Sequence, residues 1–318
     1  MSQSKLFTDW AVKLHTKTAQ AGGAVHVPGI QDVSLDPQLQ TVVRGGDGSA
    51  YNTHGSLASG SPSARFTTLA LKTLLDQCGV TGMLVDADGT HPGVVLFGQK
   101  FAAGGMRQAA ASGDHISLTL ANGLAVPRTL RADHQGDATL AIEVFAIKSG
   151  DTDPVEPSAA ASLDADTYPS ISAVWTIGKV VFDSTTIAGV RRLECDFGLQ
   201  VLTESADDDV YPTLVTIRTI QPTLTLASVH ADVLSTLTKH GKEYTAEQVL
   251  LYLKKRDEGG RLVADETAEH LKLTLGKCRV DWTYGDDPKT VTMTLTPWYT
   301  AGETPVSPVA VNTACAVA

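Results

Sequence analysis

Hydrophobic and polar residues alternate with a period of two in several stretches of the chain, and this pattern predicts β-strands. β-Branched residues recur at alternate positions there, which suits strands with one buried face. The clearest stretches are residues 213–219, 223–226, 273–275 and 290–295. Turn-forming residues at 133–137 and 284–289 separate such patterns, so each half of the chain is expected to end in a β-hairpin.

Helical spacing appears once in each half. Residues 228–237 carry apolar side chains at 229, 233, 234 and 237, one face of a helix, with Ser228 at the N-cap position. The matching segment in the first half runs over residues 68–76 and stops at Gly79, a residue typical of helix C-termini. The sequence therefore predicts mainly strands with one helix per half.

The two halves also resemble each other in sequence. At an offset of 160, nine identities occur over 46 ungapped positions from residue 29 to residue 74, where ordinary composition gives roughly three. Offsets of 155 and 151 continue the match in collinear order. The matched pairs include Gly29 with Gly189, Pro62 with Pro222, and His115 with His270. We interpret this as duplication of a domain of about 150 residues.

The predicted fold class is mainly β, with two tandem copies of a β-sandwich domain, each with a flanking α-helix. We place copy 1 at residues 1–148 and copy 2 at residues 171–300. Residues 149–170 read as an acidic linker rich in Pro, Ser and Ala, and residues 301–318 as a flexible C-terminal tail.

Each copy contains a long predicted hairpin with a polar tip, at residues 41–62 and 201–222. These tips bury too little apolar surface to order themselves, so we expect them to stay mobile until they meet a partner. A solvated loop without consequence explains the same composition. The candidate assembly-contact residues are Gly45, Asp47, Tyr51, Asp207, Asp208, Asp209 and Tyr211.

Composition and charge narrow the class of protein. Among 318 residues, 42% are hydrophobic, but no apolar run approaches the ~20 residues that span a bilayer. The N-terminus lacks the pattern of a secretory signal, so we expect synthesis in the cytoplasm. The net charge is −10, and the acidic excess lies after residue 150. This balance argues against tight DNA binding.

Motifs that carry chemistry are sparse. The four cysteines are scattered, which argues against disulfides and structural zinc. No phosphate-binding, dinucleotide-binding, esterase or metalloprotease motif occurs. Residues 86–90 resemble the start of a calcium loop, but their glycine comes too early. We expect His115 and His270 each to make a hydrogen bond at a strand edge or in a turn. The sequence thus predicts no catalytic, cofactor-binding or metal-ligating residue, and no enzyme.

A family resemblance rests on residues in the second copy. Residues 175–182, 187–190 and 196–201, then an acidic hairpin ending at Tyr211, then residues 226–228 entering a helix, are arranged in this order. This arrangement resembles the major tail-tube proteins of long-tailed, siphovirus-type bacteriophages. The resemblance covers most of residues 171–300 and, through the duplication, residues 10–147.

The resemblance implies a structural virion protein. Sheets of neighbouring domains would join into a barrel around a lumen, and stacked rings would form a tail tube that conducts DNA during ejection. Single-domain members form rings of six, so a two-copy chain would need three subunits, a homotrimer. Other implied partners are the tape measure, tail terminator and distal tail proteins, with no membrane. The implied location is the virion tail, after synthesis in the bacterial host.

The sequence also fits two alternative functions. Two β-sandwiches in tandem also suit a binding or adhesion module of a virion or cell surface, which would present exposed aromatic clusters. A tube protein of a contractile injection machine shares the domain but normally carries one copy. The two copies have also diverged, since Arg44, Gly45 and Gly46 stand where the second copy has Glu204, Ser205 and Ala206, so equal roles do not follow.

Overall fold

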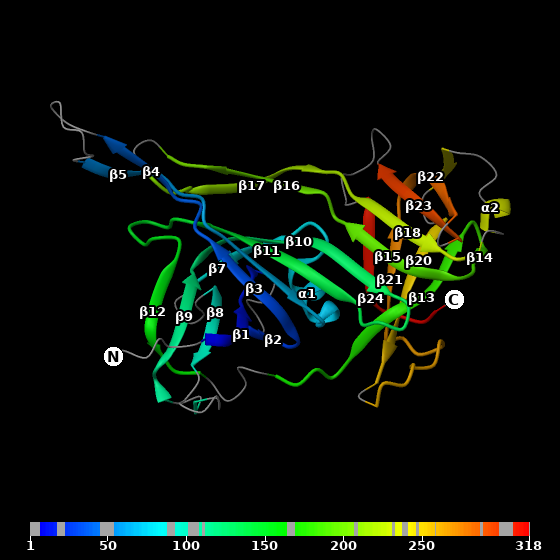
Figure 1. Ribbon diagram of the computed structural model, residues 1–318, viewed down its shortest axis with the longest axis horizontal. Helices are drawn as coiled ribbons and strands as arrows, with labels where there is room; N and C mark the ends of the chain where they lie inside the picture. Colours follow the sequence, from blue (N-terminus) through cyan, green and yellow to red (C-terminus); the bar gives the residue numbers. More distant parts are fainter. Residues whose placement is uncertain are drawn as a thin grey trace.

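The computed structural model confirms the mainly β fold class, with antiparallel sheets and two short helices among the described residues (Figure 1). The description covers residues 7–17, 23–44, 54–87, 93–100, 108–109, 112–163, 169–206, 209–230, 233–236, 241–245, 248–257, 259–286, 289–298 and 308–317.

The first half contains twelve described strands and one helix. In chain order these are β1 (Phe7–Leu14), β2 (Val25–Val27), β3 (Ile30–Asp36), β4 (Gln40–Arg44), β5 (His54–Ser59), β6 (Ser63–Thr68), α1 (Leu71–Cys78), β7 (Met83–Asp86), β8 (Val94–Lys100), β9 (His115–Leu120), β10 (Asn122–Asp133), β11 (Thr139–Ile147) and β12 (Glu156–Ala161).

The second half repeats this order in its described residues. Its elements are β13 (Val174–Phe182), β14 (Thr185–Ile187), β15 (Val190–Asp196), β16 (Leu199–Glu204), β17 (Leu214–Ile220), β18 (Thr223–Ser228), α2 (Val233–Thr236), β19 (Lys242–Tyr244), β20 (Val249–Arg256), β21 (His270–Leu275), β22 (Lys277–Asp286), β23 (Lys289–Trp298) and β24 (Val309–Cys315).

Strand pairing repeats as well. One five-stranded sheet has the order β12-β9-β8-β1-β2, and another has the equivalent order β24-β21-β20-β13-β14. Separate hairpins β4-β5 and β16-β17 extend from the two halves. The remaining strands pair as β3-β6-β11-β10-β7 and β15-β18-β23-β22-β19. Internal duplication remains our interpretation, and this repeated strand order supports it.

Equivalent turns position equivalent residues. Gly29 and Gly189 precede β3 and β15 with φ of +65° and +68°, a conformation that glycine adopts without strain. Each carbonyl accepts a backbone hydrogen bond of 3.1 Å, from Leu69 and Val229 respectively. Pro62 and Pro222 lie immediately before the equivalent strands β6 and β18. The paired residues thus occupy equivalent positions in the strand order.

The two halves share one large sheet. Its ten strands include the path β19-β22-β23-β18-β15-β10-β11-β6-β3, with β7 also paired to β10. Apolar side chains alternate to one face, where Leu130, Leu140, Leu193 and Leu224 are fully buried. These residues belong to a hydrophobic cluster that contains buried residues of both halves. A common core therefore joins the halves behind the large sheet.

Two segments differ from the sequence prediction. The predicted linker contains β12, which pairs with β9, and the predicted flexible tail contains β24, which pairs with β21. β24 also has its end residues Val309 and Cys315 buried. Both strands complete a sheet through backbone hydrogen bonds, which small and polar side chains allow, so composition alone misled the prediction.

The helices are placed close to the predicted positions. α1 ends at Gly79, whose N–H donates to the Leu75 carbonyl at 2.9 Å. α2 is described only over Val233–Thr236, and Ser228 is the last residue of β18, so the prediction of a helix from residue 228 was wrong at its start. The Ser228 hydroxyl accepts from the His230 N–H at 3.2 Å, which turns the chain after the strand.

Within the described residues, no helix combines the length and the apolar character that crossing a membrane requires.

Candidate assembly interface

The junction between the halves is a strand pair. β15 lies antiparallel to the end of β10, with Thr129 opposite Asp196, Leu130 opposite Cys195 and Arg131 opposite Glu194. Leu130 and Cys195 are fully buried on the apolar face. On the opposite face, the Asp133 carboxylate accepts from Arg192 at 3.2 Å. The junction therefore combines a backbone ladder, buried apolar residues and an exposed ion pair.

The outer face of the large sheet is polar. Its strands alternate between buried apolar residues and exposed or half-exposed residues with hydroxyl or charged groups. Threonine is frequent on this polar face, as in Thr292, Thr294 and Thr296 of β23. Charges of both signs are interspersed, including Arg65 and Asp281. We call this surface the polar face.

The second hairpin, β16-β17, extends over the first half (Figure 1). Backbone bonds fix it there, because Gly60 N–H donates to the Val210 carbonyl at 3.0 Å and Lys148 N–H donates to the Pro212 carbonyl at 2.8 Å. At the base of the hairpin, Leu199 is 2% exposed. The hairpin is thus docked within the same chain.

Lys148 provides the charged contact of this docking. Its ammonium group donates to the Asp209 carboxylate, and both side chains are about a quarter exposed. The hydrogen bond to Asp209 is the main reason that the pKa of Lys148 is raised. The basic partner of Asp209 therefore lies in the first half of the same chain.

The predicted contact residues divide into two groups. Asp209 and Tyr211 are described, and both lie against the first half; a side chain at Gly60 would come within 2.8 Å of the Tyr211 ring. Their part in contacts between subunits stays a prediction. Gly45, Asp47, Tyr51, Asp207 and Asp208 lie outside the described residues.

Among the described residues, the first hairpin lacks the cover that the second one has. In Figure 1, β4 and β5 project beyond the rest of the first half. At its base, Leu39 is 50% exposed although it is the equivalent of Leu199. Val42 and Val43 on β4 are 37% and 54% exposed. The same hairpin root is therefore buried in one half and exposed in the other.

The large sheet also has two free edges. Within the described residues, β3 is hydrogen-bonded on one side, to β6, and β22 beyond Val280 is paired on one side, to β23. These edges are the equivalents of β15 and of the end of β10, which pair with each other at the junction. Tyr284, on the free part of β22, is 46% exposed. Each free edge thus presents the surface that its equivalent uses at the junction.

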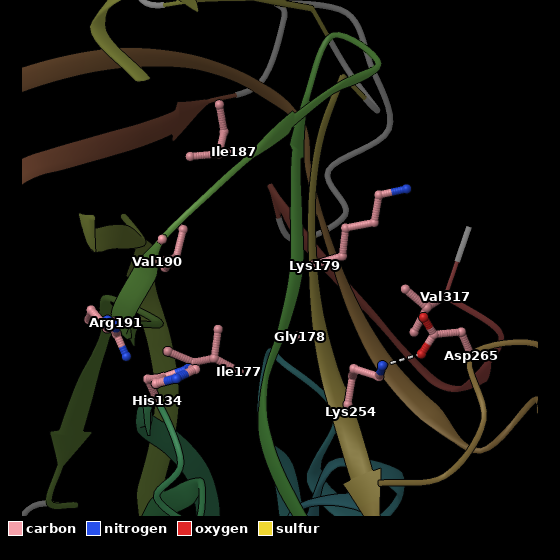
Figure 2. Close-up of a pocket in the computed structure, with 11 residues that line it drawn as sticks. His134, Ile177, Gly178, Lys179, Ile187, Val190, Arg191, Lys254, Asp265 and Val317 are labelled. Carbon is pink, nitrogen blue, oxygen red and sulfur yellow. Dashed lines mark ion pairs between the residues drawn. The ribbon is translucent and has the colours of Figure 1, made fainter. Parts of the chain in front are cut away.

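A hollow of about 440 Å³ lies near the junction (Figure 2). Figure 2 shows His134, Ile177 and Val190 on one side of β13, and Lys254 with its ion-pair partner Asp265 on the other. These side chains do not converge on one point, so the hollow offers no constellation on which to base a reaction.

His115, His270 and the four cysteines have structural surroundings. His270 Nδ1 accepts from the Lys255 N–H at 3.0 Å, so Nε2 carries the proton that is donated to the Ala264 carbonyl at 2.9 Å. His115 Nε2 lies 3.0 Å from the Ala109 carbonyl in the equivalent turn, which confirms the predicted turn bonds. The four cysteines are free and buried, and burial raises the pKa of Cys78 to about 12.

The sequence did not predict the β10–β15 junction. One signal was present, because Asp36 and Asp196 are identical in the aligned copies and end the two strands that can serve as sheet edges. An identical residue at the end of two edge strands does not show which strand each of them pairs with, because pairing depends on the tertiary arrangement.

Comparison with protein-family models finds no match for this chain, and comparison with curated proteins finds no relative.

Proposed function

We propose that this chain is the subunit of a tube, most specifically the tail tube of a siphovirus-type bacteriophage. One observation carries the proposal: two halves of equivalent strand order join edge to edge, and within the described residues the resulting sheet leaves the same two kinds of edge open, on β3 and on β22 beyond Val280. A contact of this head-to-tail kind can be repeated by further chains. Repetition closes into a ring when the rotation between units permits.

Ring closure also removes the exposed edges. An open edge presents unpaired N–H and C=O groups and is prone to uncontrolled association, which a closed barrel prevents. Three chains supply six halves, so a homotrimer would have pseudo-sixfold symmetry. Stacked rings would then form the tube, and the tape measure, terminator and distal tail proteins would contact its interior or its ends in the virion.

The polar face is suited to line the lumen. Its hydroxyl groups keep the wall wetted, and its acidic and basic groups are mixed, as with Asp281 and Arg279 on β22. A wall dense in lysine would hold DNA by counterion release, whereas a mixed polar wall with an acidic chain net charge of −10 offers little of that attraction. DNA could therefore pass without binding.

Electron microscopy of the purified chain tests this proposal, with native mass spectrometry to count subunits. We expect rings of three chains and, at higher concentration, stacked tubes. Rings of six chains would contradict the trimer. A monodisperse monomer that binds glycans would favour the adhesion module and overturn the tube.

A further inference from the structure

One residue pair of the junction recurs on the two free edges of the large sheet. Thr129 of β10 faces Asp196 of β15 at the junction. The equivalent of Thr129 is Thr283, because Thr129 lies opposite Ala141, Thr283 lies opposite Thr292, and residues 141 and 292 align between the halves. The equivalent of Asp196 is Asp36. Both members of the junction pair thus recur, with identical residue types, on the two free edges.

Burial differs at these equivalent positions in one consistent direction. Leu130 is fully buried at the junction, whereas its equivalent Tyr284 is 46% exposed. Cys195 is fully buried, whereas its equivalent Leu35 is only partly buried. Leu130, Cys195 and Leu35 alternate with outward polar residues on their strands. Tyr284 lies two and four residues after Trp282 and Val280, which pack in the core, so it also belongs to the apolar face. The free edges therefore carry apolar side chains without the cover that the junction provides.

We propose that β3 of one chain pairs antiparallel with residues 283–285 of β22 in a second copy, in the register of the junction. Asp36 then lies opposite Thr283, Leu35 opposite Tyr284, and Ser34 opposite Gly285. The ladder continues the large sheet from one chain into the next and covers Leu35 and Tyr284 on its apolar face. The occupant of each free edge is thus a second copy of this chain.

The first hairpin takes part in the same contact. At the junction, β15 leads directly into β16-β17, which docks on the half whose β10 it pairs with. β3 leads into β4-β5 in the same way, so pairing of β3 places that hairpin on the second half of the neighbouring chain. An apolar hollow of about 240 Å³ lies beside Leu35, Pro37 and Leu39, at the base of the β4-β5 hairpin.

This inference rests on the proposed function and names the partner strands of its ring. The test is oxidative cross-linking of the double variant Ser34→Cys with Gly285→Cys. Directly opposed residues of an antiparallel pair lie about 4.5–5.5 Å apart between Cα atoms, within the range of a disulfide. Ser34 and Gly285 are exposed, and the native cysteines are buried, so the background is low.

A register-shifted control uses a second position on the same face of β22, two residues away from Gly285. In Ser34→Cys with Thr283→Cys, the partners are diagonal, at about 7–8 Å, beyond easy bridging. An intrachain control, Arg131→Cys with Glu194→Cys, reproduces the same pair at the junction. We expect roughly tenfold more interchain product from the opposed pair than from the shifted pair, ending at a covalent trimer. The junction control should cross-link within one chain.

Failures of the two proposals are distinguishable by combining the gel with microscopy. Normal tubes whose opposed pair links no better than the shifted pair overturn the register and leave the tube proposal standing. Covalent trimers without tubes support the strand pairing and overturn the tube. A folded variant, shown by circular dichroism and the intrachain control, that neither links nor associates overturns the pairing.

Discussion

Leu199 and Leu39 stand at the same place in the two halves, at the root of the long hairpin, yet one is 2% exposed and the other 50%. The residue type is the same, so the difference comes from the neighbour. The second hairpin lies on the first half, and no described part of this chain lies on the first hairpin in the same way. Burial at this position is therefore supplied by the preceding half.

The edge strands β15 and β3 differ in burial in the same way. β15 buries its apolar side chains by pairing with β10, while β3 has the same alternation and only partial burial. In repeat architectures each unit is completed by its neighbour, and terminal units either carry a polar cap or remain open to another copy. Leu39, Val43 and Tyr284 are apolar rather than capped, which favours addition of another copy.

The largest expected effect is the difference in unfolding free energy between aspartate variants at Leu130 and at its equivalent Tyr284. Leu130→Asp places a carboxylate in the buried junction without a partner, and should lower the free energy of unfolding by at least about 3 kcal/mol. Tyr284→Asp changes an exposed residue, so stability should move by less than about 1 kcal/mol while self-association is lost. Urea denaturation and sedimentation measure the two quantities. Equal destabilisation by both variants would show that Tyr284 is covered within the folded chain and that this part of β22 is not a free edge.

A smaller difference is expected at the hairpin roots. Leu199→Ala leaves a cavity under the docked hairpin and should cost about 2–4 kcal/mol of unfolding free energy. Leu39→Ala removes a half-exposed side chain and should cost under about 1 kcal/mol in the monomer. Urea denaturation midpoints of the two alanine variants measure this difference. Similar losses at both sites would mean that Leu39 is covered in solution.

Much of the fold could be predicted from local pattern. Alternation of threonine with apolar residues predicts β18 and β23, and self-alignment matches His115 to His270 before the hydrogen bonds are known. Residues 156–161 and 309–315 were not predicted as strands, because these strands depend on backbone pairing with β9 and β21. Their alanine and serine content resembles that of a linker, and only the neighbouring strand turns such a segment into a sheet edge.

The candidate site was harder to predict. Asp209 and Tyr211 were selected for contacts because a polar tip suggests a partner, but sequence did not show that Lys148 and Gly60 of the same chain would be in contact with them. The apolar edge positions, such as Leu35 and Tyr284, look like ordinary strand residues in the sequence. Their exposure follows from which strand is left unpaired, which is a property of the tertiary arrangement.

Removal of Lys148 should loosen the docked hairpin without unfolding the chain. Lys148→Ala removes the ammonium that binds Asp209 and keeps the backbone bond to Pro212, so we expect faster amide exchange in β16 and β17 and unchanged exchange in β4 and β5. Hydrogen exchange with mass spectrometry measures this. Unchanged exchange in β16 and β17 would show that the ion pair does not hold the hairpin.

The pH dependence of that effect has a definite sign. The hydrogen bond to Asp209 raises the pKa of Lys148 in the folded chain, so its stabilisation is fully present below the unfolded lysine value of about 10.4. It is lost as pH rises through the higher folded value. The difference in exchange between variant and wild type, corrected for intrinsic rates, should therefore be constant between about pH 6 and about pH 8.

The smallest effect is expected at the charged pair of the junction. Arg192 and Asp133 are 46% and 47% exposed, and exposed pairs contribute little because water and salt screen them. Arg192→Ala should therefore lower the free energy of unfolding by about 0.5 kcal/mol or less, and added salt should reduce even that difference. Urea denaturation at low and high salt measures it, with Arg65→Ala on the same polar face as control. A salt-sensitive loss well above about 1 kcal/mol would mean that charge, rather than the ladder and the buried Leu130, holds the halves together. The free edge β3 has Asp32 at the position of Arg192 and cannot form the same ion pair, so it would then be a poor mimic of the junction.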